Sequence, residues 1–355
     1  MDILVISLAG IGDTFFATPL IRELRLLYPD AAIDALVMWQ GSKDLLEGNP
    51  HLNTIYHQNL IKSGLFGTAK YLWPLRKRKY DLSFNTHPQS RIAYRLVARF
   101  VNARTRISHE YENLSPLDSL LVNRSLKQNY DRHAVENNLA LLELVDKKPT
   151  QAKHQYDVFL SPQELAWADD YLKTSALAGK KLLGVHVGSG GTKNLALRRW
   201  PLSFYADLIK RLTASRSDLA ILLFGGPEEQ RDHETLNAQV DSKHVFFPNT
   251  KTLRQAATLI QKCDVFLSVD TVLMHVAAAV KVPRQIVIET PTWNKPIEPF
   301  GQSFKLVPNP GVAGRNLDFY RYDGHGIKGS TEEIIRCMQS VTVQSVQKEI
   351  ENALG

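Results

Sequence analysis

DILVISLAGIGDT, residues 2–14, decides the fold, because an apolar run leads directly into a Gly-x-Gly turn. A buried strand followed by such a turn and a helix is typical of a Rossmann-like unit, whose helix N-terminus receives a pyrophosphate. The full fingerprint has a third glycine three residues after the second, and here that place is taken by Phe15. The turn also carries a carboxylate, Asp13, which would repel a phosphate. The sequence therefore predicts that this turn holds an acid or base in a cleft and that a nucleotide binds elsewhere.

Apolar strands alternate with helical patterns along all 355 residues. This length favours two domains, and the alternation indicates parallel sheets with helices on both faces. We expect an N-terminal domain of residues 1–160, a C-terminal domain of residues 161–330, and a helical segment, residues 331–355, that packs back on the N-terminal domain. The expected strands are Ile3–Leu8, Ala32–Val37, Thr54–His57 and Leu82–Asn85 in the first domain, and Leu182–Val187, Leu219–Phe224, Val265–Val269 and Gln285–Glu289 in the second.

The composition fits a globular protein with an anionic partner. Apolar residues make up 44% and charged residues 22% of the chain, and 43 basic against 36 acidic residues give a net charge of +7. Such a surplus favours nucleic acid, a phosphorylated substrate or an acidic membrane surface. Nucleic acid is disfavoured, because the chain has no recognition module or pattern of stacking aromatics. Two isolated cysteines, no signal-peptide pattern and no membrane-spanning apolar run predict a cytoplasmic protein.

Two of the segments that follow strands are rich in glycine, and ligands of open α/β sheets bind at this edge. In the opening turn, Asp13 is either a general base oriented by the amides of the helix start or only a helix N-cap. The second segment, residues 187–193, contains three glycines and precedes Arg198. Its backbone could approach a diphosphate that the arginine neutralises, or it could be a flexible surface loop with solvated arginines.

Two further strand ends carry acids. The segment 224–229 ends in Glu228 and Glu229, which could bind a ribose diol or could only favour the first turn of a helix. In the segment 265–275, Asp270 ends a buried strand and Thr271 opens the next helix, where an anion or sugar hydroxyls could bind; an N-cap and a core histidine, His275, are the alternative. The chain has no Asp-x-Asp metal handle and no P-loop motif.

Together the four segments resemble glycosyltransferase family nine, the ADP-heptose:lipopolysaccharide heptosyltransferases, in order and over nearly the whole chain. The motifs that carry the resemblance are Gly12-Asp13 with Thr18-Pro19, His186–Ser189 with Arg198 and Trp200-Pro201, Gly225-Gly226-Pro227 with Glu229, and Asp270-Thr271 with His275. The resemblance implies an α/β protein of the GT-B fold, in which two Rossmann-like doubly wound domains face each other across a cleft. The acceptor would bind the N-terminal domain and the nucleotide sugar the C-terminal domain.

The resemblance also implies the chemistry. It predicts an inverting, metal-independent transfer of heptose from ADP-heptose to a lipopolysaccharide inner-core or related glycan acceptor, with no cofactor besides the donor. By this analogy Asp13 deprotonates the acceptor hydroxyl. The donor would be held by Ser189, Gly190 and Arg198 at the diphosphate, by Glu229 at the ribose, by Lys251, Thr252 and Leu253 at the base, and by Asp270, Thr271 and His275 at the sugar and phosphates.

Three positions depart from the family pattern and concern the donor more than the reaction. Val272 stands where the family has glycine, and a β-branched side chain does not easily take a glycine-type conformation. Arg198 stands where the family has a diphosphate-binding lysine, and the Glu228-Glu229 doublet leaves the ribose ligand open by one residue. The alternatives are a transferase for a different nucleotide sugar, a non-catalytic sugar-nucleotide or glycan-binding module, and a sugar-nucleotide epimerase on the same scaffold.

Basic residues are frequent in the N-terminal domain. Lys70 and Arg76–Lys79 share a helix-like segment with Trp73, and Arg91, Arg95, Arg99, Arg104 and Arg106 follow. This pattern suits an anionic glycolipid acceptor and peripheral contact with the inner face of the cytoplasmic membrane, although it also fits a helix C-terminus and solvated arginines. On position alone, the candidates for acceptor binding are Gly12, Asn85, His87, Gln89 and Arg91.

Overall fold

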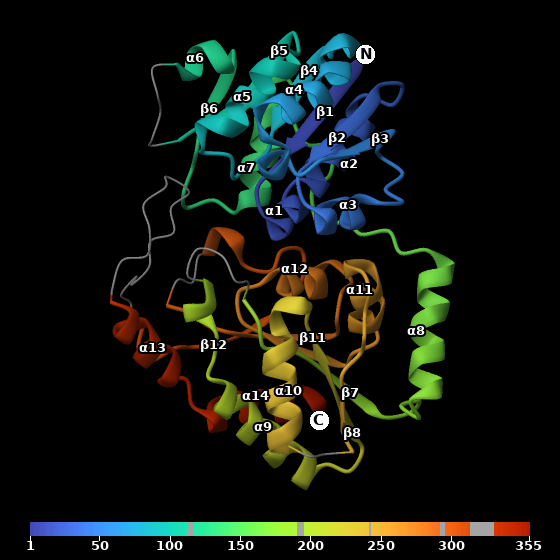
Figure 1. Ribbon diagram of the computed structural model, residues 1–355, viewed down its shortest axis with the longest axis vertical. Helices are drawn as coiled ribbons and strands as arrows, with labels where there is room; N and C mark the ends of the chain where they lie inside the picture. The colour runs from blue at the N-terminus through green and yellow to red at the C-terminus, as the bar shows by residue number, and fades with distance from the viewer. Residues whose placement is uncertain (112–116, 190–194, 241–242, 292–294, 313–329) are drawn as a thin grey trace. The chain divides into compact units, whose positions relative to one another are not determined.

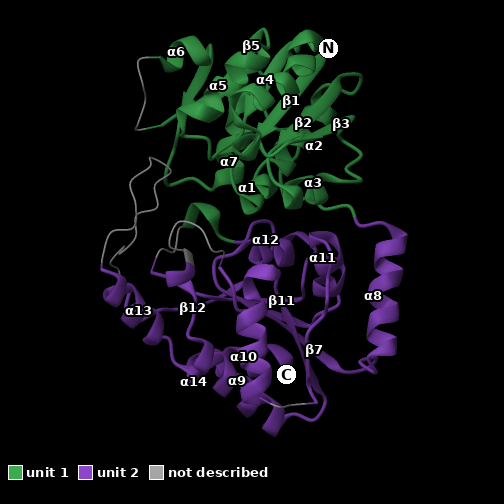
Figure 2. Ribbon diagram, viewed as in Figure 1, with its two compact units in different colours: residues 1–159, 295–298, 320–325 green, residues 160–294, 299–319, 326–355 purple. Residues whose placement is uncertain are grey.

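The computed structural model describes residues 1–355 except 112–116, 190–194, 241–242, 292–294 and 313–329 (Figure 1). The chain divides after Phe159 into two compact units, and Lys295–Glu298 joins the first of them (Figure 2). The expected α/β architecture with two Rossmann-like, doubly wound sheets is confirmed.

Unit 1 alternates strands and helices around one parallel sheet. Its strands are β1 (Asp2–Ser7), β2 (Ala32–Val37), β3 (Thr54–His57), β4 (Leu82–Asn85), β5 (Thr105–Glu110) and β6 (Arg124–Lys127). Its helices are α1 (Ile11–Phe15), α2 (Thr18–Leu27), α3 (Gln40–Leu46), α4 (Leu60–Arg78), α5 (Ile92–Val101), α6 (Asp118–Leu121) and α7 (Ala134–Ala140), followed by the 3₁₀ turn η1 (Leu141–Val145). The sheet order is β3-β2-β1-β4-β5-β6. The order reverses between β1 and β4, and open α/β sheets bind their ligands outside the carboxyl ends of the strands at such a point.

The apolar run at the start of the chain forms the centre of this unit. Residues Ile3–Ile6 are buried, because β1 is paired on both edges and covered on both faces. Leu4 and Ile6 pack with Leu72 and Leu75 of α4. Right-handed crossovers place α4, α5 and α6 on the face of the sheet that carries Leu4 and Ile6, and α2 and α3 on the opposite face. The strand of the opening motif therefore fixes both layers of helices.

Unit 2 repeats the same winding. Its strands are β7 (Lys181–His186), β8 (Leu219–Phe224), β9 (Val245–Phe246), β10 (Val265–Ser268), β11 (Arg284–Ile288) and β12 (Lys305–Val307). Its helices are α8 (Pro162–Thr174), η2 (Leu195–Arg198), α9 (Leu202–Ser215), η3 (Pro227–Glu229), α10 (Gln230–Val240), α11 (Leu253–Gln261), α12 (Val272–Ala279), α13 (Thr331–Gln339) and α14 (Val343–Leu354). The sheet order β12-β11-β10-β7-β8-β9 reverses between β7 and β10.

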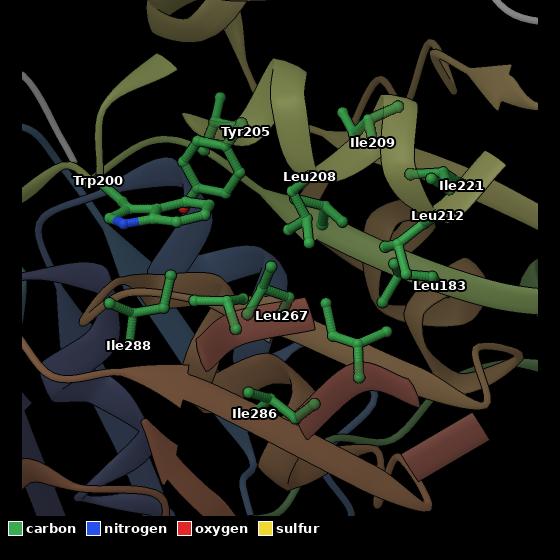
Figure 3. Packing of buried hydrophobic residues seen from close by; sticks show 14 of the residues in the cluster. Leu183, Trp200, Tyr205, Leu208, Ile209, Leu212, Ile221, Leu267, Ile286 and Ile288 are labelled. Carbon is green, nitrogen blue, oxygen red and sulfur yellow. The ribbon is translucent and has the colours of Figure 1, made fainter. Parts of the chain in front are cut away.

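The C-terminal helices complete the core of unit 2. The side chains of Val346 and Ile350 on α14 belong to the same buried cluster as Trp200, whose indole stacks edge-on against Tyr205 with 4.8 Å between ring centroids (Figure 3). Trp200 Nε1 donates to the backbone oxygen of Val341 at 2.9 Å, between α13 and α14. The sequence made residues 331–355 a candidate to pack on the N-terminal domain. In the structure their apolar side chains belong to the buried core of unit 2, and their packing on the N-terminal domain stays a prediction.

Two leucines on α2 test which face of the helix the sheet buries. Leu24 is fully buried, whereas Leu26, two residues later, is 44% exposed. We expect Leu24→Ala to lower the free energy of unfolding by about 2–5 kcal/mol, because it leaves a cavity. Leu26→Ala should change it by less than about 0.5 kcal/mol. Urea unfolding followed by circular dichroism measures both, and equal losses in the two variants would contradict this orientation of α2.

Candidate active site

The turn after β1 orients the carboxylate of Asp13. Gly10 is the N-cap of α1, and Asp13 is the third residue of the helix. The backbone N–H of Gly10 donates to Asp13 Oδ2 at 2.6 Å. A Cβ at position 10 would lie 2.9 Å from the same oxygen, so glycine gives the carboxylate room. Asp13 is thus not the N-cap, and its half-buried side chain is held at the carboxyl end of β1.

Residues from α3 and the loop before it hold the turn in place. Thr14 Oγ1 donates to Ser42 Oγ at 2.8 Å inside the unit, and the indole N–H of Trp39 donates to the backbone oxygen of Ala9. Gly41 packs against Ile11 so closely that a Cβ there would lie 2.7 Å from its Cδ1. The sequence analysis did not identify Trp39 or Ser42, because nothing local connects them to the turn.

The loop after β4 meets the end of β1. The backbone oxygen of Ile6 accepts hydrogen bonds from Thr86 N at 3.1 Å, from Thr86 Oγ1 at 3.2 Å and from Gln89 Nε2. Asn85, the last residue of β4, is fully buried, and both polar atoms of its amide lack a hydrogen-bond partner in the described part of the chain. Buried polar groups are normally paired, so Asn85 is a candidate to hydrogen-bond a water or ligand at this edge.

His87 and Gln89 are fixed by Tyr111, which follows β5. The ring of His87 stacks on Tyr111 with 5.7 Å between centroids, and Gln89 N donates to the Tyr111 hydroxyl at 2.8 Å. His87 N donates to Asn138 Oδ1 at 2.6 Å. Burial raises the pKa of Tyr111, and the charge of Asp13 adds to the effect. Burial, with smaller effects of His109 and His133, holds the pKa of His87 well below its ordinary value, so the imidazole is neutral.

The acceptor candidates differ in burial. Gly12 lies with Asp13 in the half-buried turn, and Arg91 is exposed. The other three candidates are buried: Asn85, His87 and Gln89. Arg95, expected among the arginines of the surface, is buried instead. Its guanidinium pairs with Asp118 and donates to the backbone oxygens of Gln89 at 3.1 Å and Ser90 at 3.0 Å. Arg95 therefore supports the loop after β4 from within the unit.

In unit 2, the backbone after β7 lies against Glu229. A Cβ at Gly188 would lie 2.2 Å from Glu229 Oε1, so this approach requires glycine. Glu229 Oε2 accepts the backbone N–H of Gly226 at 2.9 Å, and Oε1 lies 3.3 Å from Arg199 Nη2. Burial raises the pKa of Glu229, against the opposing effects of the Gly226 N–H and Arg199. Glu228 is exposed, so Glu229 is the residue of the doublet that turns inward.

The same edge carries a buried ion pair between η2, which follows β7, and the segment that follows β10. Arg198 Nη1 lies 2.9 Å from Asp270 Oδ2, and both side chains are largely shielded from solvent. Burial raises the pKa of Asp270, and the charge of Arg198 opposes this shift. Ser189 is buried at the end of β7. Gly190, predicted to contact the diphosphate with Ser189, lies outside the described residues.

The helix after β10 begins without strain. Thr271 is the extended N-cap of α12, Val272 is its first helical residue, and His275 is buried. Val272 is not among the described residues with positive φ, so the valine in place of the family's glycine adopts an ordinary helical conformation.

The three residues predicted to contact the base of the nucleotide lie at the start of α11. Thr252 is its N-cap and accepts from Gln255 N at 3.2 Å, while Lys251 N donates to Gln255 Oε1 at 2.7 Å. Lys251 and Thr252 are exposed, and Leu253 is half-buried. Their contact with a base stays a prediction. In the described ranges, no group of three His, Cys, Asp or Glu side chains is arranged to hold a metal ion.

Comparison with known proteins finds both related sequences and similar folds. The family model of glycosyltransferase family 9 (heptosyltransferase) matches residues 69–312. Lipopolysaccharide heptosyltransferase 3 of Escherichia coli K12 is 27% identical over 278 residues, 77% of this chain and 78% of the relative. The fold matches a family 9 glycosyl transferase from Veillonella parvula with a TM-score of 0.78 at 18% identity, over 99% of this chain and 97% of that one. It matches the ADP-heptose LPS heptosyltransferase II of E. coli with a TM-score of 0.74 at 20% identity, over 100% and 98% of the chains.

The neutral histidine beside His87 makes stability depend on pH. Burial lowers the pKa of His109 from 6.5 to about 4, and its Nε2 lies 3.0 Å from the backbone oxygen of Asn137. As the pH falls through this window, the unfolded chain takes up a proton that the folded chain excludes, so the free energy of unfolding decreases. In His109→Gln the amide keeps a donor but does not titrate. By pH 4 the variant should have lost about 3 kcal/mol less than the wild type, since one pKa unit is about 1.4 kcal/mol. Urea unfolding at a series of pH values tests this, and parallel curves would contradict it.

Proposed function

The chain belongs to glycosyltransferase family 9, and we propose that it transfers heptose from ADP-heptose to a lipopolysaccharide inner-core or related glycan acceptor. The matched relative is a lipopolysaccharide heptosyltransferase, and the name of the E. coli structure gives ADP-heptose as its donor. The observation that carries the proposal is the carboxylate of Asp13, which Gly10 orients at the crevice of unit 1 where a phosphate-binding turn would otherwise lie. Unit 2 has an arginine and a close glycine approach at the equivalent crevice.

On the acceptor side, Asp13 acts as the general base. Its carboxylate removes the proton of an acceptor hydroxyl, and the resulting oxygen attacks the anomeric carbon opposite the nucleotide. A single in-line displacement of this kind inverts the anomeric configuration. Asn85 supplies an amide with unused hydrogen-bonding capacity at the end of β4, and Arg91 supplies an exposed positive charge. His87 and Gln89 shape the loop between them.

On the donor side, the protein itself neutralises the leaving group, without a metal ion. Arg198 binds the diphosphate together with Ser189 and Gly190, since a guanidinium has five N–H donors and can keep Asp270 as a partner while it binds phosphate oxygens. This charge stabilises the diphosphate as it leaves. Glu229 binds the ribose, Lys251, Thr252 and Leu253 line the base, and Asp270, Thr271 and His275 contact the sugar and phosphates. Unit 1 is thus the acceptor domain and unit 2 the donor domain.

The place of action follows from the acceptor. A glycan of this class is anionic and lipid-linked, which suits the net charge of +7. We propose that the protein works in the cytoplasm at the inner face of the membrane, in peripheral contact with it.

Replacing the base should separate transfer from donor binding. We expect Asp13→Asn to lower kcat by about 100- to 10,000-fold, the usual contribution of a general base, with the affinity for donor unchanged. Asp30→Asn, at an exposed aspartate of the same unit, is the matched control and should keep full activity. Mass spectrometry with and without acceptor measures transfer. Normal turnover by Asp13→Asn would exclude this role for Asp13. Binding without product would indicate a binding module, and donor conversion without acceptor an epimerase.

Thermal shifts should identify the nucleotide and test Arg198. A ligand at 100 times its Kd stabilises the folded protein by about 2.7 kcal/mol, and the stabilisation grows with affinity. Among ADP-, UDP-, GDP- and dTDP-linked ligands at equal concentration, the ADP compounds should therefore raise Tm most. We expect Arg198→Met to lose this ligand-dependent shift, measured against the ligand-free variant. Arg216→Met is the control, because Arg216 pairs with the exposed Asp218 at the surface. A larger shift with another nucleotide would rule out ADP-heptose as donor.

A further inference from the structure

The most exposed large apolar side chains of the described residues lie next to each other on α4. Leu65 is 93% exposed and Phe66 is 85% exposed, and Ile61, which precedes them on α4, is 70% exposed. Single apolar residues at a surface are common, but a cluster of them usually marks a site of interaction.

A glycine creates this protruding pair. Gly64 interrupts α4 with φ 64° and ψ 179°, a conformation open almost only to glycine. A new helical segment therefore begins with Leu65 and Phe66. Further along, Leu72 and Leu75 are buried against the sheet and anchor this segment. Phe66 thus projects from the side of the helix turned away from Leu72 and Leu75, whereas Leu65, seven residues before Leu72, is exposed at the N-terminal end of the segment, beside Gly64.

The outer face of this segment alternates apolar and basic side chains. Phe66, Lys70, Trp73 and Lys77 are spaced by four, three and four residues, so they share one side of the helix, and all four are exposed. Lys77 Nζ lies 5.9 Å from the centroid of the Trp73 ring. Helices that lie in a membrane interface combine Trp, Phe and Leu with Lys in this way, because the apolar parts enter the acyl boundary while the ammonium groups stay at the headgroups.

Two neighbouring helices extend the surface. α5 packs against both α4 and α6, and the three helices lie together in unit 1 (Figure 1). Ile92 and Leu96, one turn apart on α5, are exposed, as are Leu117 and Leu120 at α6. Arg91 and Arg99 flank the two apolar residues of α5 and are also exposed.

The charge of this region selects the partner. Residues 48–109, which include α4 and α5, contain eleven lysines and arginines and a single acid, Asp81, although the whole chain has a net charge of only +7. A second copy docked on the same surface would bring two basic faces together. A surface of anionic lipid complements them, and each basic residue near it contributes about 1 kcal/mol of attraction.

We propose that the outer face of α4, continued by α5 and α6, docks on an anionic lipid bilayer. Leu65 and Phe66 insert below the headgroups, and Lys62, Lys70 and Lys77 bind lipid phosphates. In this docking, α4 lies in the plane of the interface. No helix in the described part of the chain is long and apolar enough to cross a membrane. The proposal deepens the proposed function, in which the acceptor is lipid-linked, but it stands on observations of unit 1 alone.

Sedimentation of the full-length protein with vesicles tests the surface. We expect binding to vesicles of phosphatidylethanolamine with phosphatidylglycerol and weak binding to phosphatidylcholine. Leu65→Ser/Phe66→Ser should weaken binding to the anionic vesicles about tenfold or more, because both side chains lose their insertion. Lys70→Gln/Lys77→Gln should also weaken it about tenfold and should leave binding to phosphatidylcholine unchanged. Leu26→Ser, on a helix of the other face of the sheet, is the matched control and should bind as the wild type does.

Fluorescence locates the inserted face independently. Brominated lipids should quench tryptophan emission in the wild type, and Trp73→Phe should remove most of this quenching. The exposed positions of the substituted residues predict unchanged thermal unfolding, which checks that the variants are folded. Vesicle binding that is absent, or that Leu65→Ser/Phe66→Ser leaves intact, would overturn the proposal. A dimer in light scattering without lipid, abolished by the same pair, would make a second copy the partner instead.

The docking surface and the proposed function can fail independently of each other. Transfer to a water-soluble core oligosaccharide needs no membrane. If transfer to it fails while vesicles bind, the transferase proposal is wrong and the docking surface stands. If transfer succeeds while vesicles do not bind, the docking surface is wrong and the transferase proposal stands.

Discussion

The parallel pairing of β1 with β4, and of β7 with β10, is the constraint on which the rest of the molecule depends. Crossovers leave these paired strands in opposite directions, so the loops at their carboxyl ends separate and open a crevice. The hydrogen bonds of Thr86 and Gln89 to the carbonyl of Ile6 tie the loop after β4 to the end of β1 in unit 1. Each polar group that the proposed reaction needs lies at one of these two edges or on a helix that leads to it.

The two units use the same edge for opposite charges. In unit 1 the crevice presents a carboxylate, and the positive charge of Arg95 is turned inward to Asp118 and the loop carbonyls. In unit 2 the crevice presents a guanidinium that Asp270 partly neutralises. A buried charge is tolerated only with a partner, because losing either member leaves the other unpaired and costs several kcal/mol. The same topology with different turn chemistry thus places a carboxylate at the edge of one sheet and a paired guanidinium at the edge of the other, which is the difference that the proposed function uses.

The sequence predicts those parts of the molecule whose signal is local. Strands with apolar runs, such as Ala32–Val37 and Leu219–Phe224, lie where expected, and the motifs at their ends form the two edges. β5 was missed because its buried residues Ser108 and His109 are polar, and the imidazole of His109 takes its partner, the backbone oxygen of Asn137, from a distant segment. The roles of Tyr111 and Trp39 depend on the same long-range contacts, which no spacing along the chain reveals. The conformation of Val272 and the position of the C-terminal helices were also not predicted from the sequence, because tertiary packing sets them.

The ion pair between Arg198 and Asp270 has a thermodynamic consequence for recognition. A free arginine side chain loses about 2 kcal/mol of rotamer entropy when a ligand immobilises it. Here Asp270 has already fixed the guanidinium on folding, so under the proposed function the diphosphate would meet a preorganised donor and that loss would not be incurred on binding. The diphosphate would share the guanidinium with the Asp270 carboxylate, which lies 2.9 Å from Nη1. The remaining N–H donors of the guanidinium favour a ligand that presents several oxygens at once.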